Sequence, residues 1–192
     1  GTVATATMGG TVAECAGGLR GLKYGVTKHY VMGMEVVLPT GDMVRFGGKT
    51  VKNVTAYDFA SLFVGSEGTL GIVTEIIAKL IPAPKYRKSM LALYKNLADA
   101  GKTVSGIIKA HVIPATLEIM DAMTMETVEN YAKIGLPSGY AALLLIEVDG
   151  MAKEAVEAEA EAVVQVIKAN NGELRVADND EEREKLWAAR RA

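Results

Sequence analysis

Residues 65–75 have the composition best suited to holding a cofactor. They read Gly-Ser-Glu-Gly-Thr-Leu-Gly-Ile-Val-Thr-Glu, so three of the first seven residues are glycine. Glycine is accepted where the main chain takes a positive φ or passes close to a ligand. A glycine-rich segment also exposes amide N–H groups that can bind phosphate or the polar edge of a cofactor. The same composition occurs in turns that bind nothing, so this segment alone leaves both interpretations open.

A second glycine-rich segment precedes it, because residues 9–25 contain six glycines in seventeen positions. Five short motifs follow one another along the chain: Gly9-Gly10, Ala16-Gly17-Gly18, Lys23-Tyr24-Gly25, Glu35-Val36-Val37-Leu38-Pro39 with Gly41, and Gly65-Ser66-Glu67-Gly68-Thr69-Leu70-Gly71. In this order they resemble the FAD-binding domain of the vanillyl-alcohol-oxidase type of flavoproteins. The similarity is greatest to the family members that oxidise 2-hydroxyacids, glycolate oxidase and D-lactate dehydrogenase.

The resemblance implies that FAD is the cofactor and that the main chain of both segments contacts it. The implied cofactor-binding residues are Gly9, Gly10, Glu14, Cys15, Ala16, Gly17, Gly25, Glu67, Gly68, Thr69, Leu70, Gly71, Ile72 and Val73. Many relatives have Asn at the position of Cys15, so a backbone contact is expected there. The other interpretation of Cys15 is a small buried hydrophobic residue. Lys23 and Tyr24 either approach the cofactor or, alternatively, Tyr24 packs and Lys23 is solvated.

The resemblance extends to Leu186–Arg190 and implies a substrate-binding role for Arg190. Arginine binds a carboxylate through two parallel hydrogen bonds, and Trp187 lies three positions earlier, on the same face of a helix. The alternative is a solvated basic pair at a helix C-terminus. The family implies further that electrons leave to an iron–sulfur subunit. Its catalytic base and metal ligands are expected outside this chain, so the catalytic residues are unknown and an internal, inactive fragment is predicted.

The composition of the chain argues against several other classes of protein and of binding site. The formal net charge is −2 and no basic stripe occurs, so nucleic acid is not an expected partner. Cys15 is the only cysteine, so an internal disulfide is impossible, and the two histidines, His29 and His111, are far apart in sequence. No metal site is therefore expected. No apolar run approaches the ~20 residues of a membrane span, and no signal peptide is present, so the cytoplasm is the expected location.

The first half of the chain has the turn and strand patterns of a β-rich domain. Met34–Leu38 and Met43–Phe46 predict a hairpin around Pro39–Asp42, and Ala60–Phe63 predicts one helical turn. Ile72–Ile81 predicts a long strand. Its two faces are expected to hold Ile72, Thr74, Ile76, Ala78 and Leu80 on one side and Val73, Glu75, Ile77, Lys79 and Ile81 on the other. Pro82-Ala83-Pro84 then predicts a domain boundary.

The second half alternates between strands and helices. The predicted strands are Ser89–Tyr94, Ala115–Met120, Ala142–Val148 and Glu173–Ala177, and the predicted helices are Leu97–Ala110, Ala122–Ile134, Met151–Ala169 and one that begins near Asp178–Asp180. Leu136–Gly139 and Asn170–Gly172 are the expected breaks. This order predicts an α+β sandwich with helices on one face of the sheet, similar to the cap domain of the same flavoproteins.

The predicted fold class is therefore α+β. Residues 1–84 are expected to form the C-terminal half of a vanillyl-alcohol-oxidase-type FAD-binding domain, and residues 85–192 part of an α+β, ferredoxin-like cap domain. The predicted function is FAD-dependent oxidation of a 2-hydroxyacid of the glycolate or D-lactate class in the parent enzyme. Two alternatives stay open: a non-catalytic assembly module, and a related flavoenzyme that acts on a phenol or an ether lipid. Apolar surface left uncovered in such a fragment predicts a homo-oligomer or a rearranged sheet.

Overall fold

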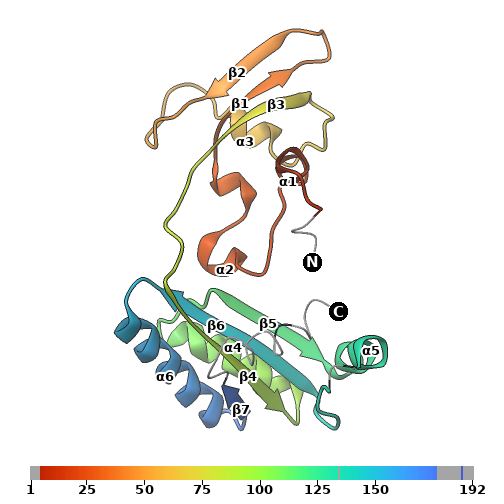
Figure 1. Ribbon diagram of the computed structural model, residues 1–192, viewed down its shortest axis with the longest axis vertical. Helices are drawn as coiled ribbons and strands as arrows, with labels where there is room; N and C mark the ends of the chain where they lie inside the picture. Colours follow the sequence, from red (N-terminus) through yellow and green to blue (C-terminus); the bar gives the residue numbers. More distant parts are fainter. Residues whose placement is uncertain (1–4, 134, 177–186, 188–192) are drawn as a thin grey trace. The chain divides into compact units, whose positions relative to one another are not determined.

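The structure is a computed structural model that describes residues 5–133, 135–176 and 187. The chain divides into two compact units (Figure 1). Unit 1 comprises Gly1–Gly21 and Gly25–Pro82, and unit 2 comprises Leu22–Tyr24 and Ala83–Ala192. The change between the units after Pro82 falls within the run of prolines and alanine at 82–84.

Unit 1 is built on an antiparallel sheet of strand order β2-β1-β3. Its strands are β1 (Val31–Val37), β2 (Met43–Gly47) and β3 (Ile72–Ala78). β1 and β2 form the predicted hairpin. Its turn contains Gly41, whose φ of 88° is a left-handed conformation that glycine adopts without strain. β3 is three residues shorter than predicted, because Ala78 already pairs with Val31, the first residue of β1.

A β-bulge in β3 overturns the predicted division of its faces. Val36 of β1 lies opposite Val73, whereas the preceding residue of β1 lies opposite Glu75. Thr74 is therefore an extra residue on β3, and the alternation of side chains shifts at that point. As a result Val73 and Ile76 both pack against the core of unit 1, although the sequence places them on opposite faces.

Short helices cover the apolar face of this sheet. The helical segments of the N-terminal region are α1 (Met8–Ala13), α2 (Gly21–Tyr24), the 3₁₀ turn η2 (Thr27–His29) and α3 (Phe59–Phe63). α1 was not expected from the sequence; it begins at Thr7, whose hydroxyl accepts a hydrogen bond of 3.0 Å from the amide of Gly10. The buried core of the unit consists of Val12, Met34, Val36, Ala60, Phe63 and Val64.

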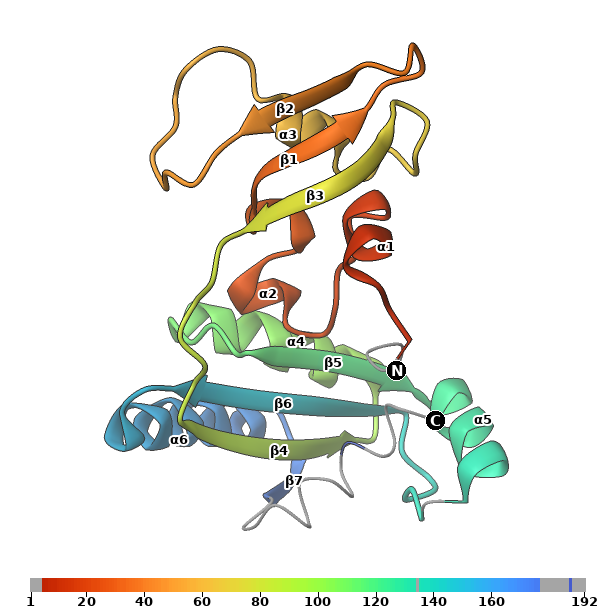
Figure 2. The same ribbon diagram turned by 45° about the horizontal axis from the view of Figure 1, so that its top comes forward.

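Unit 2 contains a four-stranded antiparallel sheet of order β5-β6-β4-β7 (Figure 2). The strands are β4 (Tyr86–Tyr94), β5 (Thr116–Asp121), β6 (Ala142–Gly150) and β7 (Glu173–Val176). β4 and β5 both pair antiparallel with β6, so they run parallel to each other with β6 between them. This is the split β-α-β arrangement of ferredoxin-like folds, and it confirms the predicted fold class.

Helices α4 (Leu97–Lys109) and α6 (Lys153–Ala169) cover one face of this sheet, as predicted. The core that they enclose includes Tyr94, Ile107, Leu144, Val163 and Ile167. Helix α5 (Ala122–Ala132) differs from the prediction. It lies at one end of the sheet in both views, and its Met125 packs with Leu143 and Leu145 on the opposite face (Figures 1 and 2).

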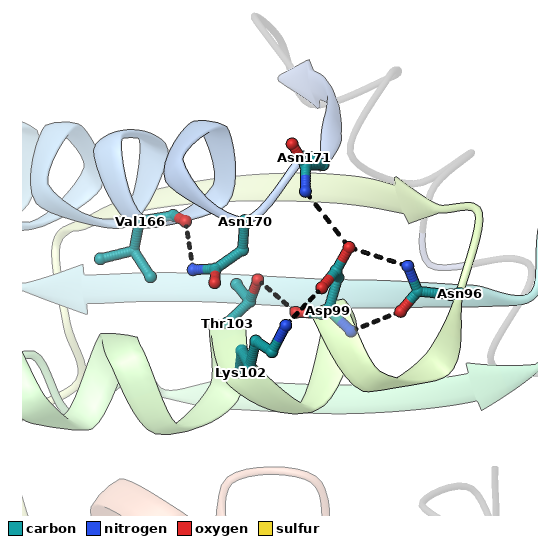
Figure 3. A network of polar contacts seen from close by, with 7 residues as sticks. All are labelled: Asn96, Asp99, Lys102, Thr103, Val166, Asn170 and Asn171. Atoms are coloured by element: carbon teal, nitrogen blue, oxygen red, sulfur yellow. Dashed lines mark hydrogen bonds and ion pairs between the residues drawn. The ribbon is translucent and has the colours of Figure 1, made fainter.

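A polar network ties the beginning of α4 to the end of α6 (Figure 3). Asp99 accepts hydrogen bonds from Lys102 (3.0 Å), from the side-chain amide of Asn96 (2.8 Å) and from Asn171 (3.3 Å). These contacts, that of Lys102 foremost, lower the pKa of the Asp99 carboxyl. The predicted stop at Asn170–Gly172 is confirmed: Asn170 caps α6, and Asn171 after it takes a left-handed conformation with φ of 60°.

The helix predicted from Asp178 onward lies outside the described residues, apart from Trp187. α5 ends at Ala132 rather than at residue 134, because Lys133 takes a left-handed conformation with φ of 49°. Among the residues that the structure describes, no helix is long and apolar enough to cross a bilayer.

Candidate functional site

The two glycine-rich segments lie side by side in unit 1. The amide of Gly65 donates to the carbonyl of Val12 (3.0 Å), and the amide of Glu67 donates to the carbonyl of Ala13 (3.0 Å). Two hydrogen bonds thus join the end of α1 to the loop before β3, across more than fifty residues of sequence. Most of the residues predicted to bind the cofactor come from these two segments, and the fold brings them together.

Left-handed backbone conformations concentrate at this junction. Gly65 and Gly68 have φ values of 82° and 76°, and the non-glycine residues Cys15 and Glu67 have values of 47° and 52°. Such conformations are costly for residues with a Cβ and tend to occur at functional sites. Cys15 is half-buried and packs beside the core of unit 1.

Most of the predicted cofactor-binding residues at the junction are exposed. The exposed predicted residues are Gly9, Gly10, Glu14, Ala16, Gly17, Glu67, Gly68, Thr69, Leu70 and Ile72. Gly9 is the most informative of them. A Cβ added there would meet no atom of the described residues within 4 Å, so packing among those residues does not explain a glycine in a helix. A glycine in such a place fits the close approach of a ligand to the backbone.

Three predicted glycines have packing reasons instead. A Cβ on Gly71 would lie 2.6 Å from Val36 Cγ1 and 2.8 Å from the carbonyl oxygen of Val37. A Cβ on Gly25 would lie 2.2 Å from His29 Nδ1, and one on Gly17 would lie 3.0 Å from a methyl group of Val26. Val73, likewise, contributes to the core. Packing thus explains Gly25, Gly71 and Val73, whereas Gly17 is both close to Val26 and exposed.

Lys23 and Tyr24, which precede Gly25, contact a buried carboxylate of unit 2. The Lys23 ammonium lies 2.9 Å from Asp149 Oδ1, and the Tyr24 hydroxyl donates to the same oxygen at 2.7 Å. The Asp149 side chain has no exposed surface. The expectation that Lys23 is solvated is therefore wrong, because a buried carboxylate needs a cation. The sequence analysis did not identify Asp149 as a partner of Lys23 and Tyr24, although the alternation along β6 places Asp149 on the same face as Leu143 and Leu145.

Arg190, the predicted substrate-binding residue, lies outside the described residues. Trp187 is described and packs against the apolar cluster of Leu91, Leu93 and Leu145. His29 and His111 are both exposed. Within the described part of the chain, no three His, Cys, Asp or Glu side chains gather as a metal site.

The residues present fit an elongated anionic cofactor such as FAD. Exposed backbone from two joined segments, with few side chains, suits contacts to a diphosphate and to the polar edge of a flavin. At Gly9 an added Cβ would meet no atom of the described residues within 4 Å, so these residues leave room for a ligand against the backbone there.

Comparison with known families gives two matches. The protein-family model described as the C-terminal domain of FAD linked oxidases matches residues 83–192. The model described as an FAD binding domain matches residues 1–47.

Several curated proteins are similar over nearly the whole chain. The glycolate oxidase subunit GlcD of Bacillus subtilis is 53% identical over 97% of this chain and 40% of its own length. D-lactate dehydrogenase of Anaerostipes hadrus is 40% identical over 97% of this chain and 41% of its own length. The chain thus spans about two fifths of the length of these relatives.

Solved structures share the fold. A structure of alkyldihydroxyacetonephosphate synthase matches with a TM-score of 0.73, at 22% identity, over 95% of this chain and 38% of that chain. A structure of p-cresol methylhydroxylase matches with a TM-score of 0.62, at 18% identity, over 83% of this chain and 37% of that chain. Together the matches agree with the resemblance drawn from the five motifs.

Proposed function

The chain belongs to the family of FAD-linked oxidases, and on this premise we propose that a protein that contains it oxidises a 2-hydroxyacid of the glycolate or D-lactate class. The observation that carries the proposal is the similarity, along nearly the whole chain, to both a glycolate oxidase subunit and a D-lactate dehydrogenase. Because the chain spans two fifths of these relatives, the activity is proposed for a protein of their length.

In the proposed reaction the 2-hydroxyacid becomes a 2-oxoacid. Bound FAD supplies a two-electron acceptor that takes the α-hydrogen as hydride. The hydroxyl proton leaves to a base, which we place outside this chain. Arg190 is proposed to pair with the substrate carboxylate through two parallel hydrogen bonds.

The role that we propose for the described residues is to bind the cofactor. We propose that the main chain at Gly9, Gly10 and Gly68 lies against FAD, supported by the left-handed loop that the hydrogen bonds of Gly65 and Glu67 fix. Gly71 keeps this loop against β1, because its lack of a side chain allows the close approach.

We propose further that residues 1–84 are part of an FAD-binding domain and residues 85–192 part of a cap domain. On that view we propose that the chain alone does not turn over substrate. An iron–sulfur electron-transfer subunit as partner and a cytoplasmic location stay predictions.

Anaerobic reduction of the flavin tests the function. In a protein that contains this chain and has the full length of its relatives, glycolate or D-lactate should bleach the flavin absorbance. Arg190→Ala should raise the substrate concentration for half-maximal rate by roughly 10- to 150-fold, as for a lost charge-assisted hydrogen bond. Arg175→Ala, at an exposed arginine of β7, is the matched control and should leave this concentration unchanged. Flavin that no 2-hydroxyacid reduces would refute the proposal.

A further inference from the structure

A cavity of about 440 Å³ lies in unit 1 at the end of β3 that is opposite to the glycine-rich loop 65–71. Its walls come from the loop between β2 and α3, from the first residues of β1, and from His29 and Lys79. The volume falls within the ~300–1,000 Å³ of small-molecule sites. Nothing in the proposed function uses this cavity.

The loop that forms the wall has a defined, strained conformation. The side-chain oxygen of Asn53 accepts a hydrogen bond from the amide of Thr55 (3.2 Å), which closes a tight turn. Ala56 follows with φ of 60°, a left-handed conformation that is unfavourable for alanine. Strained residues of this kind persist where the surrounding structure holds them, and they are frequent at ligand sites.

A row of aromatic rings anchors the next residue. The ring of Tyr57 lies edge-on to Phe59 with 5.9 Å between centroids, Phe59 lies 5.2 Å from Phe46, and Phe46 lies 5.2 Å from Phe63 in the core. Tyr57 itself is 85% exposed. A ring fixed at one edge and open to solvent offers a stacking surface to a planar group.

The polar lining includes the hydrogen-bond donors His29 and Lys79 beside Thr50, Asn53, Thr55, Tyr57 and Asp58. His29 Nδ1 accepts from the amide of Val26 (3.1 Å), which leaves Nε2 as the nitrogen that can donate. Lys79 contributes an ammonium group. Asp58 is the one acid among the described lining residues, and both of its oxygens accept hydrogen bonds from Ser61, at 3.0 and 2.6 Å. Because Ser61 occupies both oxygens of Asp58, His29 and Lys79 are the lining groups that can bind an oxyanion.

We propose that this cavity binds an anionic ligand that carries a planar ring, with Lys79 and His29 at the anionic group and Tyr57 against the ring. A nucleoside monophosphate is the simplest probe of this chemistry. The site is distinct from the glycine-rich junction, because the seven residues of β3 separate Lys79 from the loop that ends at Gly71.

Titration of the isotope-labelled chain with AMP, adenosine and ribose 5-phosphate tests the proposal by NMR. AMP should shift the amide signals of residues 53–57 and of Lys79 saturably, and should leave those of Gly9 and Gly68 in place. Lys79→Gln should weaken AMP and ribose 5-phosphate by about tenfold, the loss expected for one charge-assisted contact. Tyr57→Ala should weaken AMP and adenosine and leave ribose 5-phosphate unchanged.

Two matched variants control for exposed residues of the same type. Lys85→Gln and Tyr131→Ala change an exposed lysine and a tyrosine that is 82% exposed, both in unit 2, and should leave AMP binding unaltered. The proposal is overturned if AMP gives no saturable shifts, if the shifts fall at Gly9 and Gly68 instead of residues 53–57, or if Lys79→Gln behaves like Lys85→Gln.

Discussion

Replacing Gly9 by alanine separates the contribution of this residue to folding from its contribution to a ligand. Within the described part of the chain the added Cβ meets no atom within 4 Å, and alanine favours a helix by up to ~1 kcal/mol over glycine. The free energy of unfolding should therefore stay the same or rise slightly. If FAD lies against this backbone, the same methyl group occupies space that the ligand needs, which costs ~1–3 kcal/mol and weakens binding roughly five- to 150-fold.

The assay pairs thermal unfolding with a titration of flavin fluorescence. Gly101→Ala in α4 is the matched control, since Gly101 is also a helical glycine whose added Cβ meets nothing within 4 Å. Both variants should be at least as stable as the parent, and only Gly9→Ala should lose FAD affinity. An FAD affinity for Gly9→Ala within twofold of that for Gly101→Ala would refute the reasoning.

Three further predictions concern stability. Gly71→Ala should lower the free energy of unfolding by ~1–3 kcal/mol, because its Cβ would lie 2.8 Å from a backbone carbonyl; Gly48→Ala, with open space around it, should not, and equal urea midpoints for the two would contradict this. Thr116→Val should stabilise by about 1 kcal/mol, since the Thr116 hydroxyl is buried without a partner among the described residues; a lower melting temperature would show that a partner exists. The lowered pKa of Asp99 adds stability above the ordinary carboxyl pKa that is lost as pH falls through the lowered value, so Asp99→Asn should flatten the decline of melting temperature below about pH 4.

The strands and helices of unit 2 were predictable because each has a strong local pattern. The dense apolar run of β6 indicates an internal strand, and β6 lies between β4 and β5. In α6 the apolar residues Val156, Val163 and Ile167 face the core as their helical spacing requires. The predicted ends differ from the observed ends by up to three residues, as at the start of β4.

Unit 1 was harder to predict because long-range contacts override local preference. Gly9 and Gly10 argue against a helix, yet Thr7 caps one that packs Val12 into the core. Thr74 shifts the register of β3, and no rule of alternation anticipates an inserted residue.

The candidate site was predictable in its residues and not in its geometry. Glycine content and order along the chain identified both segments. The hydrogen bonds from Gly65 and Glu67 that join them depend on the fold of the whole unit. The packing role of Gly71 depends on Val36 and Val37, which are distant in sequence. The packing role of Gly25 depends on how the chain turns His29 toward it.

A residue-resolved NMR titration of the labelled chain with FAD tests the central claim most directly, namely that the two joined glycine-rich segments lie against the cofactor. The account predicts saturable shifts of the amide signals of Gly9, Gly10, Gly68 and Leu70, all on exposed backbone. The claim would be contradicted if the signals of these four residues stayed in place at FAD concentrations that shift other amides. It would also be contradicted if FAD caused no saturable shift of any amide signal.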